Sequence, residues 1–348
     1  MLIQRGVLIG ASVVLVGALL LFWSSSSAQN GLEQPEQVEV RWLLSHQPTD
    51  VFTRSAQVFA DELAKESDGT MVLRVLLPED VGAGPGDVPY AEVLEQFASG
   101  SAELASAYTI ALGHEQPAFW ALNLPFLFSS YEETGPVLDG PAGKEILGTL
   151  TGSVRALAFT MSGGFRIIAS KNTAVKTLKD LEGKRIATSG GPVAEATLRA
   201  LGAIPVPLAM ETGKTLDGAS LDGAETTYAR LSSVVGSNTE YLKYINETNH
   251  SLFLTAIVVR SDFYDSLSSA QQQALQHAAQ KAAEVERADS ITLNEETKRQ
   301  LAESGSVVTE LPSSVRDAFR EETDVVYADL ASVLGKELVD ALRGVRNK

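Results

Sequence analysis

The chain has 348 residues, which is enough for two domains or for one large α/β unit. Its 44 acidic and 28 basic side chains give a formal net charge of -16, which argues against binding to nucleic acid or to an anionic membrane surface. The absence of cysteine excludes thiol catalysis, thiolate zinc sites, disulfide scaffolds and a lipidated N-terminal cysteine.

The first 28 residues differ from the rest of the chain. Arg5 is their only charge, and an apolar run from Val7 to Trp23 is followed by four serines and Ala28. Small residues at Ser26 and Ala28 favour cleavage of a secretory signal peptide after Ala28. The alternative is an uncleaved anchor formed by residues 7–23, since about 17 residues are the minimum for a membrane span. Both alternatives place the rest of the chain outside the cytoplasm.

Residues 29–37 are polar and predict a linker, after which strands and helices alternate. The hydrophobic patterns predict a strand, a helix, a second strand, a loop rich in Gly and Pro, another helix and a third strand. In chain order these elements cover residues 38–45, 49–67, 71–77, 78–89, 90–98 and 104–110.

A second β–α–β unit begins at Lys184. It comprises a strand over 185–188, a helix that runs from the turn at 189–192 to Leu201, and strands over 204–208, 221–226 and 251–260. Residues 268–301 then predict one helix of about 50 Å, because Ala and Leu recur at helical spacing without Gly or Pro. We expect a helix of that length to run across two domains. The alternation of strands and helices predicts mostly parallel sheets, which bind ligands at the ends of their strands.

The sequence holds no motif of an enzyme or of a metal site. Its four histidines lack both the HExxH pattern and the i,i+4 His pairs that zinc sites use: His46, His114, His250 and His277. It holds neither a Gly-rich loop ending in GK[ST] nor a GxSxG elbow. We therefore predict no catalytic residue, no metal and no cofactor, and a protein that is not an enzyme.

Several short segments together resemble one family of transport receptors. The segments are His46-Gln47-Pro48, Glu92–Gly100 (EVLEQFASG), Leu124–Phe128 (LPFLF), Gly164-Phe165-Arg166, Lys179–Lys184 (KDLEGK), Leu221–Glu225 (LDGAE) and Thr248-Asn249-His250. Each match is weak alone. Their order and spacing over residues 38–340 resemble the solute-binding proteins of tripartite ATP-independent periplasmic (TRAP) transporters, the C4-dicarboxylate-binding-protein-like family.

The resemblance implies an α/β, two-lobed periplasmic-binding-protein-like fold with a central ligand cleft and a long lobe-spanning helix. The first lobe would hold residues 38–163 and about 252–291, and the second residues 164–251 and about 292–348. The implied function is to capture a small organic acid or related polar metabolite by hinge closure and to deliver it to small and large permease subunits in the membrane. The alternative is a membrane-anchored receptor that presents its ligand to a sensor or signalling partner.

Members of this family commonly grip a carboxylate with an Arg in a GLKIRVP-like strand, and this sequence departs from that pattern. The matching stretch, Gly183–Ser189, places Ala187 at the Arg position. Three replacements remain open. Arg166 in the GFR motif is the first, since a guanidinium offers a planar pair of donors to a carboxylate. Arg185 is the second, and the Ser189-Gly190-Gly191 turn, with backbone N–H groups at a helix start, is the third.

The resemblance places further candidate ligand contacts near the ends of the predicted strands. Glu225 and Thr226 follow the Asp222-Gly223 turn, and Thr226 stands where the family usually has Asn. The remaining candidates are polar, aromatic or thioether side chains near the expected cleft: Tyr108, Tyr228, His46, Gln47 and Met210. For each of these candidates, packing or scaffolding is the alternative role.

Overall fold

The computed structural model describes most of the chain from residue 37 onward. The residues outside its description are 1–36, 47–48, 84–86, 209–219, 232–238 and 347–348. The predicted signal peptide over residues 1–28, and with it the predicted anchor over residues 7–23, therefore lies outside the described residues. Within the described part, no helix is both long and apolar enough to cross a membrane.

Sheet A consists of five strands, in the spatial order β2 (Met71–Leu76), β1 (Val38–Leu43), β3 (Leu104–Tyr108), β10 (Leu252–Arg260) and β4 (Val154–Phe165). Strand β1 pairs in parallel with β2 and β3, whereas β10 runs antiparallel to β3 and β4. β10 is buried at every residue but its last, as expected for a central strand rich in Leu, Val and Ile.

Sheet B consists of six strands, in the spatial order β11 (Val307–Glu310), β9 (Tyr244–Glu247), β5 (Ile167–Ser170), β8 (Gly223–Thr226), β6 (Arg185–Thr188) and β7 (Ile204–Pro207). Here β5 runs antiparallel to β8 and β9, and the other described pairs are parallel. The prediction of mostly parallel sheets was therefore wrong around β10 and β5. These two strands directly follow a connection between the sheets, and each runs against its neighbours.

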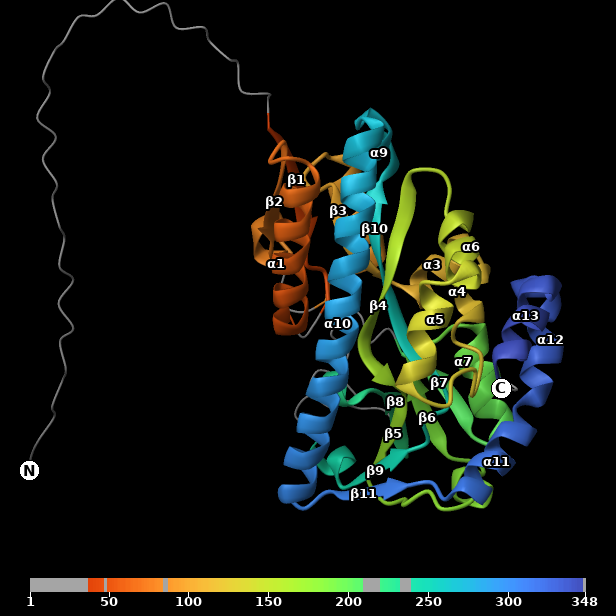
Figure 1. The fold of residues 1–348 in the computed structure, drawn as a ribbon. Coiled ribbons are helices and arrows are strands. Elements are labelled where there is room, and N and C mark those ends of the chain that lie inside the picture. Colours follow the sequence, from red (N-terminus) through yellow and green to blue (C-terminus); the bar gives the residue numbers. More distant parts are fainter. Residues whose placement is uncertain (1–36, 47–48, 84–86, 209–219, 232–238, 347–348) are drawn as a thin grey trace, which may run out of the picture. The chain divides into compact units, whose positions relative to one another are not determined.

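Helices cover both sheets (Figure 1). The α-helices are α1 (Thr49–Glu66), α2 (Tyr90–Ala98), α3 (Thr109–Glu115), α4 (Ala118–Ala121), α5 (Thr134–Leu138), α6 (Pro141–Thr149), α7 (Pro192–Ala200), α9 (Ser261–Ser266), α10 (Ser269–Glu303), α11 (Ser313–Glu322), α12 (Asp324–Leu334) and α13 (Lys336–Arg346). Short 3-10 turns are η1 (Pro78–Val81), η2 (Tyr131–Glu133), η3 (Leu178–Leu181), η5 (Tyr228–Arg230) and η6 (Thr239–Leu242).

Helix α10 runs alongside both sheets (Figure 1). It begins at a capping box, in which Ser268 and Gln271 each bond the other's backbone N–H through their side chains. From there it packs on α1 and β4, and further along it contacts η5 and β11 of the second sheet region. The structure thus confirms the prediction of a single long helix that spans both halves of the fold.

The chain crosses between the sheets at Arg166, which is the single residue between β4 of sheet A and β5 of sheet B. The Arg166 N–H donates to the Ser251 carbonyl at 2.8 Å, directly before β10 returns to sheet A. The two crossings are therefore hydrogen-bonded to each other. A side chain at residue 166 is held between the two sheets by the connectivity of the chain itself.

The C-terminal helices bridge elements of both predicted lobes. Helix α12 contacts α4 and α7, and α13 contacts α4 and α6. The Tyr327 hydroxyl of α12 donates to the Pro125 carbonyl at 2.9 Å, within the LPFLF motif. The predicted division gave residues 292–348 to the second lobe, whereas α13 packs on elements of the first. The lobe boundaries themselves stay a prediction.

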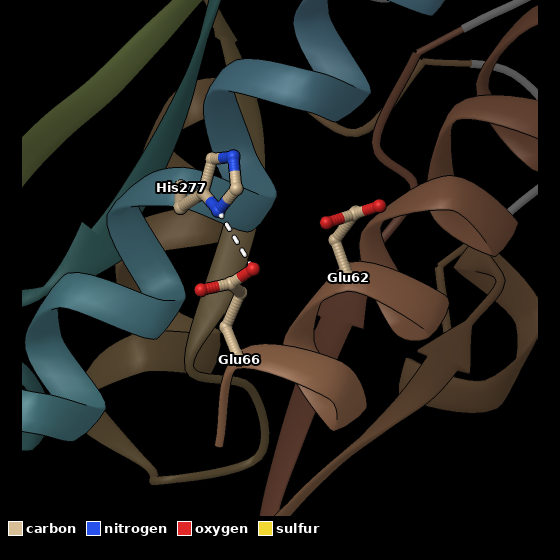
Figure 2. Close-up of side chains that lie close together, drawn as sticks. All are labelled: Glu62, Glu66 and His277. Atoms are coloured by element: carbon tan, nitrogen blue, oxygen red, sulfur yellow. Dashed lines mark ion pairs between the residues drawn. The ribbon is translucent and has the colours of Figure 1, made fainter. Parts of the chain in front are cut away.

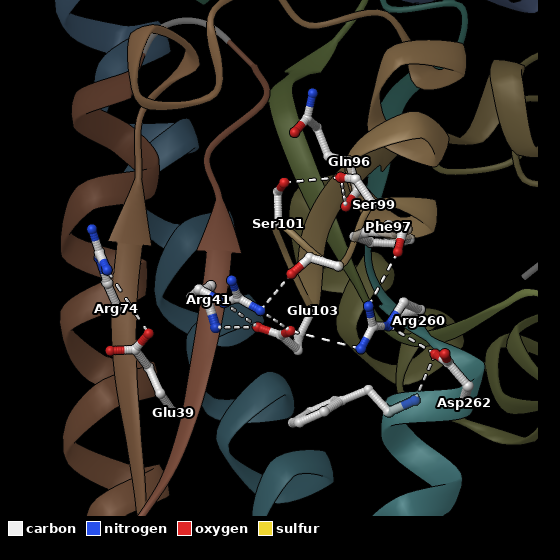
Figure 3. A network of polar contacts seen from close by, with 12 residues as sticks. Glu39, Arg41, Arg74, Gln96, Phe97, Ser99, Ser101, Glu103, Arg260 and Asp262 are labelled. Atoms are coloured by element: carbon white, nitrogen blue, oxygen red, sulfur yellow. Dashed lines mark hydrogen bonds and ion pairs between the residues drawn. The ribbon is translucent and has the colours of Figure 1, made fainter.

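A charged network closes the end of sheet A that is remote from Arg166. Figure 3 shows the buried Glu103 carboxylate between Arg41 of β1 and Arg260, the last residue of β10. Arg41 donates to Glu103 through its backbone N–H and its side chain, at 2.5–3.0 Å. Arg260 donates to the Phe97 carbonyl at 3.1 Å. The network thus links α2, β1 and β10 through hydrogen bonds and ion pairs.

A glycine in β4 lies where the strand pairing is interrupted. The β4–β10 register jumps between Met161 and Gly164, and Gly163 adopts φ +102°. The Gly163 carbonyl accepts a hydrogen bond from the Asn294 side chain of α10 at 2.6 Å. A Cβ atom at residue 163 would lie 2.3 Å from the Thr227 Oγ1 atom. This bulge therefore requires glycine both for its backbone angle and for the space it leaves.

We expect Gly163→Ala to lower the free energy of unfolding by about 2 kcal/mol, from the positive-φ strain and the overlap with Thr227. Urea unfolding monitored by circular dichroism measures it. Gly148→Ala is the matched control, because a Cβ there meets no described atom within 4 Å and the residue lies within α6. An equal loss in both variants would contradict the requirement for glycine at the bulge.

Candidate ligand-binding site

Arg166 lies buried at the crossing, with 2% of its surface exposed. Its Nη1 atom donates to the Ser189 hydroxyl and to the Glu225 carboxylate, each at 3.2 Å. Its guanidinium stacks on the Phe253 ring of β10, 4.4 Å from the ring centroid. Its Nη2 atom is buried and has no hydrogen-bond partner among the described residues. One donor of the guanidinium fork is therefore left for a group that the described protein does not supply.

Glu225 of β8 is fully buried and is held by three side chains. Its carboxylate accepts hydrogen bonds from Arg166, from the Thr188 hydroxyl and from His250 Nε2 at 2.7 Å, and Thr248 in turn contacts His250 Nδ1 at 2.8 Å. Burial alone would raise the pKa of Glu225. Arg166, His250 and Thr188 outweigh burial and lower this pKa to about 2. Glu225 is thus ionised at neutral pH, and it neutralises Arg166 and holds it in place.

The predicted Ser189-Gly190-Gly191 turn joins this cluster. Gly190 and Gly191 have φ of +89° and +91°, which a side chain would disfavour, and α7 begins directly after them at Pro192. The Gly190 N–H donates to the Thr188 hydroxyl at 3.3 Å, and the Ser189 hydroxyl accepts a hydrogen bond from Arg166 Nη1. The structure therefore brings together four predicted residues, Arg166, Glu225, Ser189 and Gly190. We call Arg166, Glu225, Thr188, Ser189 and His250 the Arg166 cluster.

Aromatic side chains from sheet A form the neighbouring surface. Tyr108, at the end of β3, stacks on Phe253 with 5.0 Å between ring centroids and on His46 with 3.8 Å. His46 is 2% exposed, and its Nδ1 atom has no hydrogen-bond partner among the described residues. Burial lowers the pKa of His46 to about 4, so the imidazole is neutral at pH 7. The predicted residues Tyr108 and His46 thus lie on the sheet A side of the Arg166 cluster.

A second buried arginine, which the sequence did not reveal, links the two sides. Arg230 at the end of η5 bonds the Tyr108 hydroxyl and donates to Asp87 Oδ2 at 2.8 Å. Its guanidinium stands over Phe253 at 5.4 Å and over Tyr108 at 5.1 Å. Burial would raise the pKa of Asp87, but Arg230 and His46 lower it below its usual value. We call Arg230 and Asp87 the Asp87 pair. The sequence indicated this pair only through Arg230, a charged residue that follows shortly after the LDGAE motif.

Other predicted site residues lie elsewhere or outside the description. Arg185 is exposed at the first residue of β6, where its Nε donates to the Ser220 carbonyl at 2.8 Å. The Tyr228 hydroxyl donates to Glu247 at 3.0 Å, and its ring joins the apolar core of sheet B. Thr226 is buried and its hydroxyl bonds the Thr227 carbonyl. Gln47 and Met210 lie outside the described residues.

The structure also explains why Ala187 is compatible with an arginine-based site. Ala187 lies in the apolar cluster with Ile167 and Ala224, on the other face of sheet B from Glu225. Thr188, one residue later, points to Glu225. The side chain at position 187 therefore does not face the Arg166 cluster, and an arginine there would enter the core.

Figure 2 shows a separate group of possible metal ligands, Glu62 and Glu66 of α1 and His277 of α10, whose ligand atoms lie within 4.8 Å of one another. Lys65 bonds Glu62 at 2.8 Å and Glu66 at 3.4 Å, so an ammonium already compensates both carboxylates. His277 Nδ1 lies 3.4 Å from Glu66. We interpret this group as a solvated contact between the two helices.

Two sheets joined by crossing strands, with buried charged side chains of the Arg166 cluster and aromatic side chains of sheet A brought together beside the crossing, are typical of a ligand-binding protein of the two-lobed type. The family described as bacterial extracellular solute-binding protein, family 7, has a model that matches residues 44–333. The chain belongs to this family. It is similar to a C4-dicarboxylate-binding protein of Bacillus subtilis, with 23% identity over 84% of this chain and 82% of that protein.

Solved structures agree with this assignment. A TRAP periplasmic solute-binding protein from Ochrobactrum anthropi superposes with a TM-score of 0.76 and 25% identity, covering 90% of this chain and 96% of that chain. One from a Bradyrhizobium species, in complex with galacturonate, gives a TM-score of 0.73 and 25% identity, covering 89% and 100%. The predicted family, two-lobed α/β fold and function as a solute receptor of a TRAP transporter are thus confirmed. The comparisons favour transport over the sensor alternative.

Proposed function

We propose that the protein captures a small organic acid between its two sheets, with the carboxylate held by Arg166 and by the Ser189-Gly190-Gly191 turn. Three further predicted contacts, Glu225, Tyr108 and His46, position these groups or line the same space. The ligand is then handed, without chemical conversion, to a permease made of a small and a large membrane subunit. In this proposal the protein works in the periplasm after export by its N-terminal segment.

The observation that carries the proposal is the Nη2 atom of Arg166, which has no hydrogen-bond partner in the described part of the chain. A buried N–H donor without a partner costs about 1–3 kcal/mol, and more when the group is charged. A ligand carboxylate would satisfy this donor with a charge-assisted bond, which contributes about 1.5–3 kcal/mol. Glu225 takes Nη1 and leaves Nη2 for the ligand, so the guanidinium is already oriented before the ligand arrives.

The names of relatives agree with an acidic ligand. The Bacillus subtilis relative is a C4-dicarboxylate-binding protein, and the Bradyrhizobium structure holds galacturonate. Both ligands carry at least one carboxylate, which is the group that the Arg166 fork suits. The proposal therefore requires a carboxylate and leaves the rest of the ligand to the neighbouring side chains.

Thermal-shift measurements against a panel of sugar acids, hydroxy acids and dicarboxylates test the proposal. We expect at least one acid to raise the melting temperature, because a ligand that binds only the native state stabilises it. Each acid is matched with a neutral analogue, for example galactonate with galactitol, and the neutral member should give no shift. Stabilisation by neutral polyols or by cations, with none by acids, would refute a carboxylate site at Arg166.

A further inference from the structure

The two buried arginines beside Phe253 are not equivalent. Arg166 has one donor, Nη2, without a described partner, whereas Arg230 bonds both Asp87 and Tyr108. Their distances to the Phe253 centroid are 4.4 and 5.4 Å, so both face the same ring. Arg166 thus has a donor to offer to an anion, while Arg230 is already bonded to a carboxylate of the protein.

Among the described residues, the charged side chains around Phe253 form pairs of opposite charge. Arg166 is paired with Glu225, Arg230 is paired with Asp87, and His46 is neutral at pH 7. All four ionic side chains are at least nine-tenths buried. One ligand carboxylate adds one negative charge to this balanced set. A second carboxylate would add another in a poorly solvated space, close to the ionised Asp87, and no further described cation contacts Phe253.

The groups on the sheet A side suit hydroxyls. The Asp87 carboxylate accepts hydrogen bonds, as it does from Arg230 and from the Tyr108 hydroxyl at 2.7 Å. The Nδ1 atom of the neutral His46 has no described partner and can bond a hydroxyl as donor or acceptor, according to its tautomer. Hydroxyl groups satisfy such positions without adding charge, whereas a carboxylate would meet the like charge of Asp87.

We infer that the site selects hydroxylated monocarboxylic acids and discriminates against dicarboxylates, and that Asp87, paired with Arg230, is the residue that sets this preference. This inference rests on the proposed function, since it places the single carboxylate at Arg166. Asp87 therefore acts as a specificity residue. It forms an ion pair with Arg230 within the protein, and its negative charge repels a second anionic group on the ligand.

Pairs of acids that differ only at one terminal carbon provide the test. Calorimetry compares galactonate with galactarate, gluconate with glucarate, and glycerate with tartronate, using the full mature chain at pH 7. In each pair the second acid carries a carboxylate where the first has a hydroxymethyl group. We expect at least one monocarboxylate to bind at least tenfold more tightly than its dicarboxylate. A dicarboxylate that binds as tightly as its partner, or binding of dicarboxylates alone, would overturn the inference.

The Asp87→Asn variant tests the assigned residue. Asparagine keeps a hydrogen-bonding oxygen for Tyr108 but removes the negative charge that is paired with Arg230. The ratio of the two dissociation constants should then move at least tenfold in favour of the dicarboxylate. Asp265→Asn is the control, since Asp265 is exposed and pairs with Arg155 beyond the far end of β10. An unchanged ratio in Asp87→Asn removes Asp87 from this role, because a purely structural effect would weaken both acids alike.

These results separate the inference from the proposed function. If dicarboxylates bind best and Arg166→Lys still weakens their binding about tenfold, the Arg166 anchor stands and the inference fails. If no acid of either kind binds, both fail. If a monocarboxylate binds preferentially but independently of Arg166, the carboxylate anchor fails, and the inference fails with it because it places the carboxylate at Arg166.

Discussion

The Arg166→Ala variant is expected to bind its acid at least tenfold more weakly than the native protein, and to be less stable. It loses a charge-assisted bond of about 1.5–3 kcal/mol to the ligand. It also leaves Glu225 ionised and fully buried without its cation, and such breakage of a buried pair costs about 3–5 kcal/mol. Calorimetry measures the binding and urea unfolding measures the stability.

Arg166→Lys separates the two effects. The ammonium of lysine can still compensate Glu225 and so spare most of the stability, but it lacks the planar pair of donors that serves Glu225 and a ligand together. Binding should therefore fall about tenfold while the unfolding midpoint changes little. The control is Arg185→Ala, because Arg185 is exposed and the described hydrogen bond of its side chain goes to the Ser220 backbone carbonyl. Weakened binding in Arg185→Ala with native-like binding in Arg166→Lys would reverse our assignment.

The periodic elements of this chain could be predicted from sequence because local patterns dominate them. The predicted helix over residues 90–98 and strand over 185–188 coincide with α2 and β6, and the long helix agrees within two residues at each end. Strand β4 was not predicted. It contains glycines at 163 and 164, and such a local pattern predicts a turn. Its pairing with β10 joins residues that are far apart in the sequence. The antiparallel crossings have the same long-range origin.

The site residues also fall into two groups, those that a local motif indicates and those that only the tertiary fold brings together. Arg166 and Glu225 stand in short motifs, so the resemblance indicated them, and the structure brings them to 3.2 Å. Asp87 belongs to a loop rich in Gly and Pro, 143 positions from Arg230 along the chain. Only the tertiary fold brings these two charges together, and no local spacing encodes it. Arg185 and Tyr228 share strands or turns with site residues but have other partners, because neighbouring positions face in different directions.

A buried carboxyl group lies in the middle of α10. Glu286 is fully buried, accepts the Met161 N–H at 2.5 Å and the Ser290 hydroxyl at 2.8 Å, and lies beside Arg287. Burial raises its pKa to about 8, because these bonds and Arg287 only partly offset the loss of solvation. The carboxyl is therefore protonated in the native state at pH 7, whereas it is ionised in the unfolded chain.

The sign of the pH effect follows from these two states. Between the ordinary glutamate pKa and about 8, the unfolded chain holds fewer protons than the native protein, so the free energy of unfolding falls as pH rises. Glu286→Gln is neutral in both states and keeps an acceptor for Met161. We expect the free energy of unfolding of Glu286→Gln to exceed that of the unmutated protein by up to about 4 kcal/mol at pH 8. The difference between the two proteins should be much smaller at pH 5.

Urea unfolding of both proteins at pH 5, 6.5 and 8 measures this difference. Because all other titrating groups are common to the two proteins, the change of the gap with pH reports Glu286 alone. Glu296→Gln on the same helix is the control, since Glu296 is exposed and should leave the pH dependence unchanged. A gap that stays constant from pH 5 to 8 would mean that Glu286 is ionised in the native state. The bond to Met161 would then be a charge-assisted anchor of the β4 bulge, and Glu286→Gln would destabilise the protein at every pH.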